Sequence, residues 1–281
     1  MLYTYYAHSL ELLANHFANR IDTVDSDPIQ PVWVIVQNNE IKEWLSIKSS
    51  SVNGIAGNFK FIFPSEFLWT LYRLKKDDIP KALPSDLNSM QWSLYKLFKK
   101  RPDLLDAIPF YDSEQSTQSK RFQLCGQLAD VFDQYQVYRP DMLTKWERGK
   151  FQTKQSDEKW QIKIWRELND FWNNLDISYS IPSRAQAYSD LMEWIKSGDS
   201  QLLDAIPDDL YVFGLSQLNA PFLNIITQLA SVKNIHHYQN KVNFKDKNKE
   251  LQSLLELWDR SSEEQLDLLS SLTKKQNIDH E

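Results

Sequence analysis

Hydrophobic positions in the first quarter of the chain alternate between two kinds of spacing. The run VWVIVQ at 32–37 is β-branched and apolar at successive positions, which is typical of a strand buried on both faces of a parallel sheet. FKFIF at 59–63 has the same character. Between and beside these runs, apolar residues recur at helical spacing, starting after cap residues such as Ser9 and Asn38. The alternation predicts an α/β layer.

From about residue 84 the pattern becomes almost entirely helical. Apolar spacing predicts helices at 88–101, 118–138, 141–148, 156–175 and 183–197. Strand character returns at LYVFGL (210–215), followed by a helix at 220–232 and a short strand at 235–239. We therefore predict an α/β domain with a parallel sheet, formed by 1–80 and 205–245 and interrupted by a helical insertion domain at 81–204. Residues 246–281 are expected to form a helical tail, a linker or the start of a further domain.

Composition narrows the class of protein. Of the 281 residues, 42% are hydrophobic and 25% are charged, which is ordinary for a globular protein with its own core. A single cysteine excludes an internal disulfide and a C-x-x-C zinc site. The start of the chain lacks the features of a signal peptide, and no apolar run is long enough to span a membrane. We expect a cytoplasmic protein without membrane contact.

The residues themselves predict no catalytic, cofactor or metal site. The turn after VWVIVQ, from Asn38 to Lys42, has no glycine to wrap a phosphate and carries Glu40 where an anion would approach. His236 and His237 point to opposite faces of a strand, so we expect a half-buried strand with one exposed imidazole. The formal net charge of −6 argues against general coating of duplex DNA.

The segment QLCGQLADVFDQYQVYRPDMLTKWERG at 123–149 carries the most specific pattern. One helical stripe is apolar, and the opposite face holds Asp130, Asp133 and Gln134. Arg139 follows at the helix end, where the next proline restricts its backbone. Such side chains can pair with base edges or phosphate. The alternative is an ordinary solvated helix face.

A second group of candidates lies at the ends of the first predicted strands. Gln37, Asn39 and Glu43 surround the end of the strand at 32–37, and Phe63 and Trp69 flank the next strand–helix junction. Amide, carboxylate and aromatic side chains together could grip unstacked bases. Alternatively, Trp69 is a core residue and Gln37 a turn residue.

Four stretches of the chain resemble the N-terminal part of the RecC family, the gamma subunits of exodeoxyribonuclease V (the RecBCD helicase–nuclease). They are LYTYYAHSLELL, VWVIVQNNEIKEWLSIKSSSVNGIAGNFKFIFPSEFLW, LADVFDQYQVYRPDMLTKWERG and LYVFGLSQLNAPFLNIITQLA. The third is the most specific, because a D-x-F-D-Q-Y-x-V-Y-R-P-D run is long and compositionally unusual. The resemblance reaches from residue 1 to about 240, and the family's subunit is far longer.

The resemblance implies a RecA-like fold of the superfamily 1 helicase type that has lost its P-loop and carries a large helical insertion. It implies a subunit without catalysis of its own, in which ATP and magnesium are needed only by the partner subunits. Those partners would be RecB-like and RecD-like chains, contacted through exposed aromatics such as Trp146 or Trp165. The implied role is to split duplex ends and scan single-stranded DNA for a Chi-like sequence.

The resemblance also implies which residues contact DNA. These positions are Gln37, Asn39, Glu43, Phe63, Trp69, Asp130, Val131, Asp133, Gln134, Arg139 and Arg184. Asn39, Glu43, Phe63 and Val131 depart from the commonest pattern of the family. The rival interpretation is a helical protein-interaction scaffold with no direct DNA contact.

Overall fold

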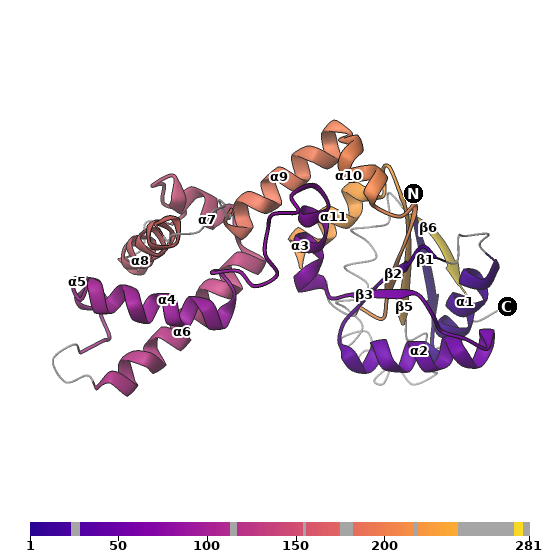
Figure 1. Cartoon of the computed structure of the whole chain (residues 1–281), viewed down its shortest axis with the longest axis horizontal. Coiled ribbons are helices and arrows are strands. Elements are labelled where there is room, and N and C mark those ends of the chain that lie inside the picture. The colour runs from indigo at the N-terminus through magenta and orange to yellow at the C-terminus, as the bar shows by residue number, and fades with distance from the viewer. Residues whose placement is uncertain are drawn as a thin grey trace, which may run out of the picture. The chain divides into compact units, whose positions relative to one another are not determined.

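The chain divides into two compact units in a computed structural model. The structure describes residues 1–23, 29–112, 117–153, 156–174, 182–215, 219–240 and 273–277. An α/β unit comprises Met1–Leu74 and Trp194–Glu281, and a helical unit comprises Lys75–Glu193 (Figure 1). The α/β unit is thus formed by two segments that are far apart in the sequence.

A parallel sheet forms the centre of the α/β unit. Its spatial order is β3, β2, β4, β5, β1, β6, and each neighbouring pair is parallel. The strands are β1 (Leu2–Ala7), β2 (Val32–Val36), β3 (Phe59–Ile62), β4 (Asp209–Phe213), β5 (Asn234–Asn240) and β6 (Thr273–Asn277). Parallel strands need crossover connections, and the helices between them supply these crossovers. The predicted α/β class with a parallel sheet is confirmed.

The helices of this unit begin where the sequence supplies caps. Helix α1 (Leu10–Thr23) starts after Ser9, whose Oγ accepts a hydrogen bond from the Glu11 N–H at 3.1 Å. Helix α2 (Asn39–Asn53) ends at Gly54, which has the left-handed φ of 77° that a non-glycine residue adopts at a cost. The remaining helices are α3 (Pro64–Lys75), α9 (Arg184–Ser197), α10 (Ser200–Ala205) and α11 (Ala220–Leu229); α9 crosses the division between the units.

Aromatic packing holds α1 against the sheet. The ring of Phe17 meets Tyr211 of β4 edge-on at 5.3 Å and Tyr238 of β5 at 5.7 Å. Tyr5 of β1 stacks on Tyr238 at 4.8 Å. These contacts join strands from both ends of the sequence, so the core fixes the position of the returning segment.

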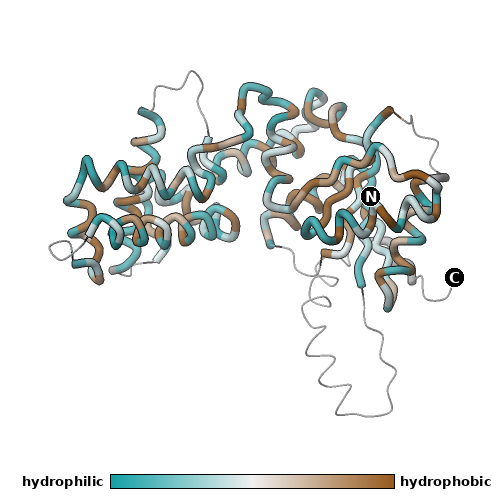
Figure 2. Tube along the Cα trace, turned by 60° about the horizontal axis from the view of Figure 1, so that its bottom comes forward, coloured by the Kyte–Doolittle hydropathy of each residue, from teal (hydrophilic) through white to brown (hydrophobic). Residues whose placement is uncertain are grey.

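The helical unit has a core of its own. It consists of α4 (Leu87–Lys100), α5 (Asp103–Asp106), α6 (Gln118–Tyr138), α7 (Pro140–Glu147), α8 (Ser156–Asn173) and the first part of α9. Hydrophobic and hydrophilic residues alternate along these helices, as amphipathic packing requires (Figure 2). Phe132 of α6 packs on Trp165 of α8 at 5.3 Å. Helix α6 has the bounds predicted from its apolar spacing.

Three expectations need correction. Trp146 and Trp165, expected as exposed partner contacts, are 1% and 0% exposed. Both lie on the core-facing stripe of their helices, and the Trp146 indole donates to Glu158 at 2.8 Å. Part of the tail expected to be helical is strand β6; the rest of 246–281 lies outside the described residues. The short helices α5 and α10 were not predicted, because a single turn leaves little periodicity to detect.

Candidate nucleic-acid interface

Three polar candidates gather where strand β2 meets helix α2. Gln37 directly follows the strand, Asn39 is the first residue of the helix, and Glu43 lies one turn further along. All three are exposed. In parallel sheets the carboxyl ends of the strands are the usual place for ligand contacts. These side chains therefore offer two amides and a carboxylate at a suitable edge of the sheet.

The turn between β2 and α2 is built as a capped helix start. The Asn38 side-chain oxygen accepts a hydrogen bond from the Ile41 N–H at 3.0 Å. That N–H is one of the groups a phosphate would use at a helix N-terminus. Glu40 adds a carboxylate in the first turn. The start of α2 thus carries an amide cap at Asn38 and a carboxylate at Glu40.

The two aromatic candidates lie deeper in the α/β unit. Phe63, between β3 and α3, is half-buried against the core beneath α1 and α2, and its carbonyl accepts from the Glu66 N–H at 2.9 Å. Trp69 of α3 is only 6% exposed and meets Tyr72 edge-on at 5.8 Å. This packing leaves little of the Trp69 ring for a base to stack on, and its main contribution here is to the core.

Helix α6 presents an exposed hydrogen-bonding face in the helical unit. The Gln134 side-chain amide donates to the Asp130 carboxylate at 3.0 Å, one turn away. Both residues are exposed, whereas Val131 is half-buried and turns toward the apolar stripe. The bond orients the Gln134 amide, so that its carbonyl oxygen remains as an acceptor. The pair can meet base edges with a fixed geometry.

Beside this face lies a partly buried group of opposite charges. Burial raises the pKa of the Asp133 carboxyl, and the positive charge of Arg184 opposes that rise. Burial likewise lowers the pKa of the Arg184 guanidinium, while Asp133 and Asp86 oppose the fall. The three side chains therefore influence one another although they come from α6, the start of α9 and the N-cap of α4. The charges of Arg184 and Asp86 therefore act on Asp133 beside the exposed face.

Arg139 joins helices α6 and α7. It serves as the C-cap of the first and the N-cap of the second, with φ −134° and ψ 49°, and Pro140 begins α7. Its guanidinium is half-exposed and lies 3.8 Å from the Asp141 carboxylate. A long exposed pair of this kind contributes little to stability. The guanidinium therefore remains accessible to a phosphate or a guanine edge.

Comparison with known families supplies the decisive observation. A profile described as "RecC, N-terminal domain" matches residues 2–280, nearly the entire chain. The chain belongs to the RecC N-terminal domain family.

Individual RecC relatives are similar over most of this chain. The RecBCD enzyme subunit RecC of Escherichia coli K12 is 30% identical over 244 residues, which cover 84% of this chain and 21% of that protein. The RecC subunit of Haemophilus influenzae is 28% identical over 270 residues, covering 85% of this chain and 23% of its own length. That of Mycolicibacterium smegmatis is 22% identical over 244 residues. The chain spans about a fifth of the length of the curated relatives it matches.

Within this RecC domain the candidate positions fall into two groups. Those of the α/β unit are Gln37, Asn39, Glu43, Phe63 and Trp69, and those of the helical unit are Asp130, Val131, Asp133, Gln134, Arg139 and Arg184. The first group lies where β2 and β3 are followed by α2 and α3, and the second lies on α6, at its C-cap and at the start of α9. Their contact with DNA stays a prediction.

Sequence reasoning overlooked Asp86. Its Oδ2 accepts from the Leu83 N–H at 2.7 Å, and its charge acts on both Asp133 and Arg184. The available signal was its place just before an apolar helical pattern, which is typical of an N-cap. Its approach to Arg184, far along the sequence, leaves no trace in local spacing.

The two adjacent histidines also need correction. The expectation of one exposed imidazole is wrong, since His236 and His237 are 0% and 2% exposed. Strand β5 lies in the interior of the sheet between β4 and β1, and its residues from Ile235 to Gln239 are buried on both faces. His236 stacks on Tyr3 and lies 2.6 Å from the Asp209 carboxylate. This buried pair supports the sheet at the end opposite to Gln37.

The described part of the RecC domain offers little support for metal binding, thiol chemistry or membrane insertion. Among the described residues, no group of three or more His, Cys, Asp or Glu side chains could hold a metal ion. Burial raises the pKa of the Cys125 thiol to about 12, so it is a poor nucleophile at neutral pH. None of the helices described is both long and apolar enough to cross a bilayer.

Proposed function

We propose that the chain is the non-catalytic, DNA-contacting N-terminal part of a RecBCD-type helicase and exonuclease, and that it meets single-stranded DNA. The observation that carries the proposal is the exposed face of α6. There Asp130 and Gln134 are hydrogen-bonded to each other, Arg139 lies at the helix end, and Asp133 is subject to the positive charge of Arg184. Carboxylates, amides and arginine are the groups that pair with base edges.

The α/β unit supports the absence of a motor in this proposal. A parallel sheet with a helical unit between its segments fits a RecA-like domain of superfamily 1 helicase type. In such a domain the first strand–helix turn would hold the nucleotide phosphates. Here Asn38 occupies the helix start, and Glu40 adds negative charge. Energy for translocation would come from the partner subunits, with their ATP and magnesium.

Net negative charge is compatible with this role. Unstacked single strands are read largely through base edges and stacking, and only a local positive lining is needed for phosphate. Arg139 supplies an accessible cation on the helical unit. A protein that grips bases in this way tolerates an acidic outer surface, which a general duplex-coating protein does not.

The remaining parts of the role follow from the family. The RecC relatives are named as subunits of the RecBCD enzyme. By analogy the partners would be RecB-like and RecD-like chains, and the substrate would be a duplex DNA end whose separated strand is scanned for a Chi-like sequence in the cytoplasm. Because Glu43 stands among the candidate positions, the sequence read would differ in at least one base from that of relatives with a neutral residue there.

Site-specific photo-crosslinking tests the proposal. A benzophenone amino acid replaces Gln134, within the complex that carries the chain, and single-stranded DNA is added before irradiation. The matched control replaces Gln123, which is exposed on the same helix at its other end. We expect DNA crosslinks at 134 and none at 123. Equal crosslinking at both positions, or none at 134, would contradict the proposal.

A matched pair of arginines gives an independent measurement. Arg139→Gln should weaken single-strand binding by about five-fold, because a charge-assisted contact to phosphate or guanine is lost. Arg148→Gln removes the same charge from the other end of α7 and should leave the affinity unchanged. Equal losses would indicate general electrostatic attraction instead of a defined contact.

One observation favours the alternative role, a protein-interaction scaffold without direct DNA contact. Trp92 and Phe110 of the helical unit are 55% and 70% exposed, which suits contact with another protein. If the chain joins RecB-like and RecD-like partners, yet position 134 never crosslinks to DNA in that complex, the scaffold role is the better description.

A further inference from the structure

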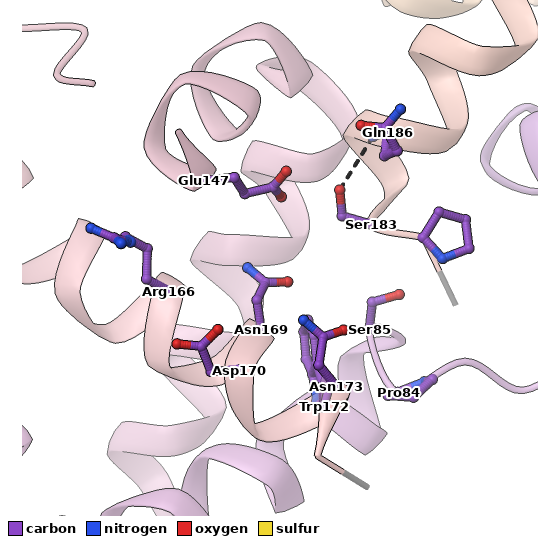
Figure 3. Close-up of a pocket in the computed structure, with 11 residues that line it drawn as sticks. Pro84, Ser85, Glu147, Arg166, Asn169, Asp170, Trp172, Asn173, Ser183 and Gln186 are labelled. Carbon is purple, nitrogen blue, oxygen red and sulfur yellow. Dashed lines mark hydrogen bonds between the residues drawn. The ribbon is translucent and has the colours of Figure 1, made fainter. Parts of the chain in front are cut away.

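A polar cavity lies inside the helical unit, next to the α6 face. Its volume is about 360 Å³, and its walls come from the end of α7, from α8 and from the start of α9 (Figure 3). Ser85 and Ser183, which precede Asp86 and Arg184, form part of the wall. The cavity thus adjoins the charged group formed by Asp86, Asp133 and Arg184. Its volume is in the range of small-molecule sites.

One acidic residue that lines this cavity, Glu147, is partly buried. Glu147 points toward Ser183 from the end of α7. Burial raises the pKa of the Glu147 carboxyl, and Ser183 and Trp165 oppose the rise. Its Oε1 is buried without a hydrogen bond. A buried acceptor without a partner is costly, which makes it a natural place for a donor from a ligand.

The aromatic part of the cavity wall carries a hydrogen-bond donor, whereas Glu147 carries an acceptor. Trp172 of α8 lines the cavity, and its indole meets Trp165 edge-on at 5.9 Å, which fixes the ring. The Trp172 Nε1 is buried without an acceptor. A ligand that satisfies both groups must carry a donor for Glu147 and an acceptor for Trp172. An ammonium side chain from another protein can only donate hydrogen bonds, so it pairs with Glu147 and leaves the Trp172 N–H without an acceptor.

Three further lining residues add two hydrogen-bond acceptors and a positive charge to the cavity. Asn169 donates to the Trp165 carbonyl at 3.0 Å, and Gln186 donates to Asp190 at 2.6 Å, so the side-chain carbonyl of each amide remains as an acceptor. Arg166 is an exposed cation of the same lining. An apolar ring, amide groups and one cation together match a planar base attached to a phosphate.

We propose that this cavity holds one unstacked nucleobase that carries an exocyclic amino group, with its phosphate at Arg166. The proposal rests on the proposed function, because it assigns a base of the contacted single strand to this cavity. The amino group donates one hydrogen to Glu147 and the other to the side-chain oxygen of Asn169, and a ring nitrogen or carbonyl accepts from the Trp172 N–H. Cytosine satisfies both groups, whereas thymine offers one ring N–H and no amino group.

Nucleoside binding to the full chain tests the cavity directly. Saturation-transfer NMR with deoxycytidine and thymidine, each alone and then in competition, should show at least about five-fold preference for deoxycytidine, as one good base contact provides. The 5′-monophosphate of deoxycytidine should bind more tightly than the nucleoside, and Arg166→Gln should remove that difference. No transfer to any nucleoside, or equal transfer to both, overturns the proposal.

Variants separate recognition from loss of structure. Glu147→Gln keeps the shape but offers an N–H, so the preference should shift toward thymidine, whose carbonyl accepts. Trp172→Phe keeps the ring packing and loses the N–H, which should weaken deoxycytidine binding. Glu193→Gln, an exposed site outside the cavity, is the matched control. An unchanged preference in Glu147→Gln, with the fold verified by circular dichroism, overturns the assignment.

The test distinguishes this proposal from the broader one. The cavity is formed by residues of the helical unit alone, so a nucleoside can bind it without any partner subunit. Crosslinks at position 134 with no nucleoside binding refute the base-holding cavity and leave the DNA contact intact. Stronger binding of Nα-acetyl-lysine amide, whose side-chain ammonium stays charged, than of deoxycytidine would instead assign the cavity to a basic protein segment.

Discussion

The two units of the chain bury different titratable groups. Every histidine of the sequence lies outside Lys75–Glu193, and two of them, His236 and His237, are buried in the sheet. The helical unit buries carboxylates, chiefly Glu147 and Glu158. Because imidazole and carboxyl groups titrate in different pH ranges, the units should respond to acid differently.

In the α/β unit, mild acid should favour unfolding. Burial lowers the pKa of His237 to about 4, below its ordinary value of 6.5. In the unfolded chain His237 therefore binds a proton near pH 6.5, whereas in the folded sheet it stays neutral at that pH. Stability is therefore complete above that pH and falls as the pH drops from about 6.5 toward 4. His236, whose pKa burial also lowers, adds to the same trend.

In the helical unit, mild acid should have the opposite or no effect. Burial raises the pKa of Asp133 and of Glu147, so the folded unit binds protons before the unfolded chain does. Falling pH therefore favours the folded unit in this range. Glu158 acts in the other direction, but only at lower pH, where an ordinary carboxyl titrates. The two units are therefore expected to differ in how their stability changes in mild acid, and each can be measured separately.

The largest expected effect comes from emptying the helical core. Trp165→Ala should lower the free energy of unfolding of the helical unit by about 3–5 kcal/mol, because Trp165 is 0% exposed. Urea titration with pulse proteolysis, and fragment mapping by mass spectrometry, would show earlier cleavage inside 75–193. Trp92→Ala removes the same side chain from an exposed position and should cost far less. Equal destabilisation of the α/β unit would show that the two cores are not separate.

A smaller effect is expected from the carboxylate that ties α7 to α8. Glu158 accepts from the Trp146 indole at 2.8 Å, from the N–H groups of Gln152 and Thr153 at 2.6 and 2.7 Å, and from the Thr153 hydroxyl at 2.8 Å. Burial opposes its charge, but these bonds prevail and lower the pKa of Glu158. Glu158→Gln should therefore cost about 1–3 kcal/mol at neutral pH.

The pH dependence of that cost provides its control. A lowered carboxyl pKa contributes stability above the ordinary value, and this contribution disappears as the pH falls through the folded pKa. The difference between Glu158→Gln and the original chain, measured by urea titration, should shrink in acid. Glu193→Gln is exposed and should show no difference at either pH. A loss that stays constant with pH would mean that packing, not charge, explains it.

The histidine effect comes next in size. Between pH 7 and pH 5 the α/β unit should lose roughly 1–2 kcal/mol through His237. His237→Phe should remove that part of the slope, whereas His8→Gln, at an exposed site, should keep it. Pulse proteolysis at the two pH values would report each unit separately. If the helical unit lost as much stability as the α/β unit between pH 7 and pH 5, the predicted difference between the two units would be wrong.

How far the sequence predicts the structure depends on the range of the interaction. Strand β2, the Asn38 cap and helix α6 follow from local spacing and local hydrogen bonds, and these were predicted. The burial of His237 depends on which elements cover its strand, and strand order leaves no local pattern. Trp165 differs, because it lies on the apolar stripe of α8 with Ile162 and Leu168, a spacing that the sequence does show.

The candidate site shows the same limit. The polar face of α6 is visible in the sequence, because Asp130 and Gln134 lie one turn apart. The influence of Arg184 on Asp133, and of Asp86 on both, joins three separate elements and becomes visible only in the fold. The cavity with Glu147 and Trp172 was likewise absent from the sequence prediction, since its walls come from several helices.

The smallest expected effect concerns the exposed edge of the sheet. Glu43 is the negative charge among the polar candidates of β2 and α2, and it is exposed there. If a DNA strand passes this edge, Glu43→Gln should tighten single-strand binding by about two-fold at low salt, because one repulsion between carboxylate and phosphate disappears. Fluorescence anisotropy with a labelled oligonucleotide, repeated at two salt concentrations, would measure the gain and its screening. Asp204→Asn, exposed on α10 before the first residue of β4, is the matched control. An equal gain from both variants would reflect net charge alone, and the contact between DNA and the α/β unit would then rest on Gln37 and Asn39.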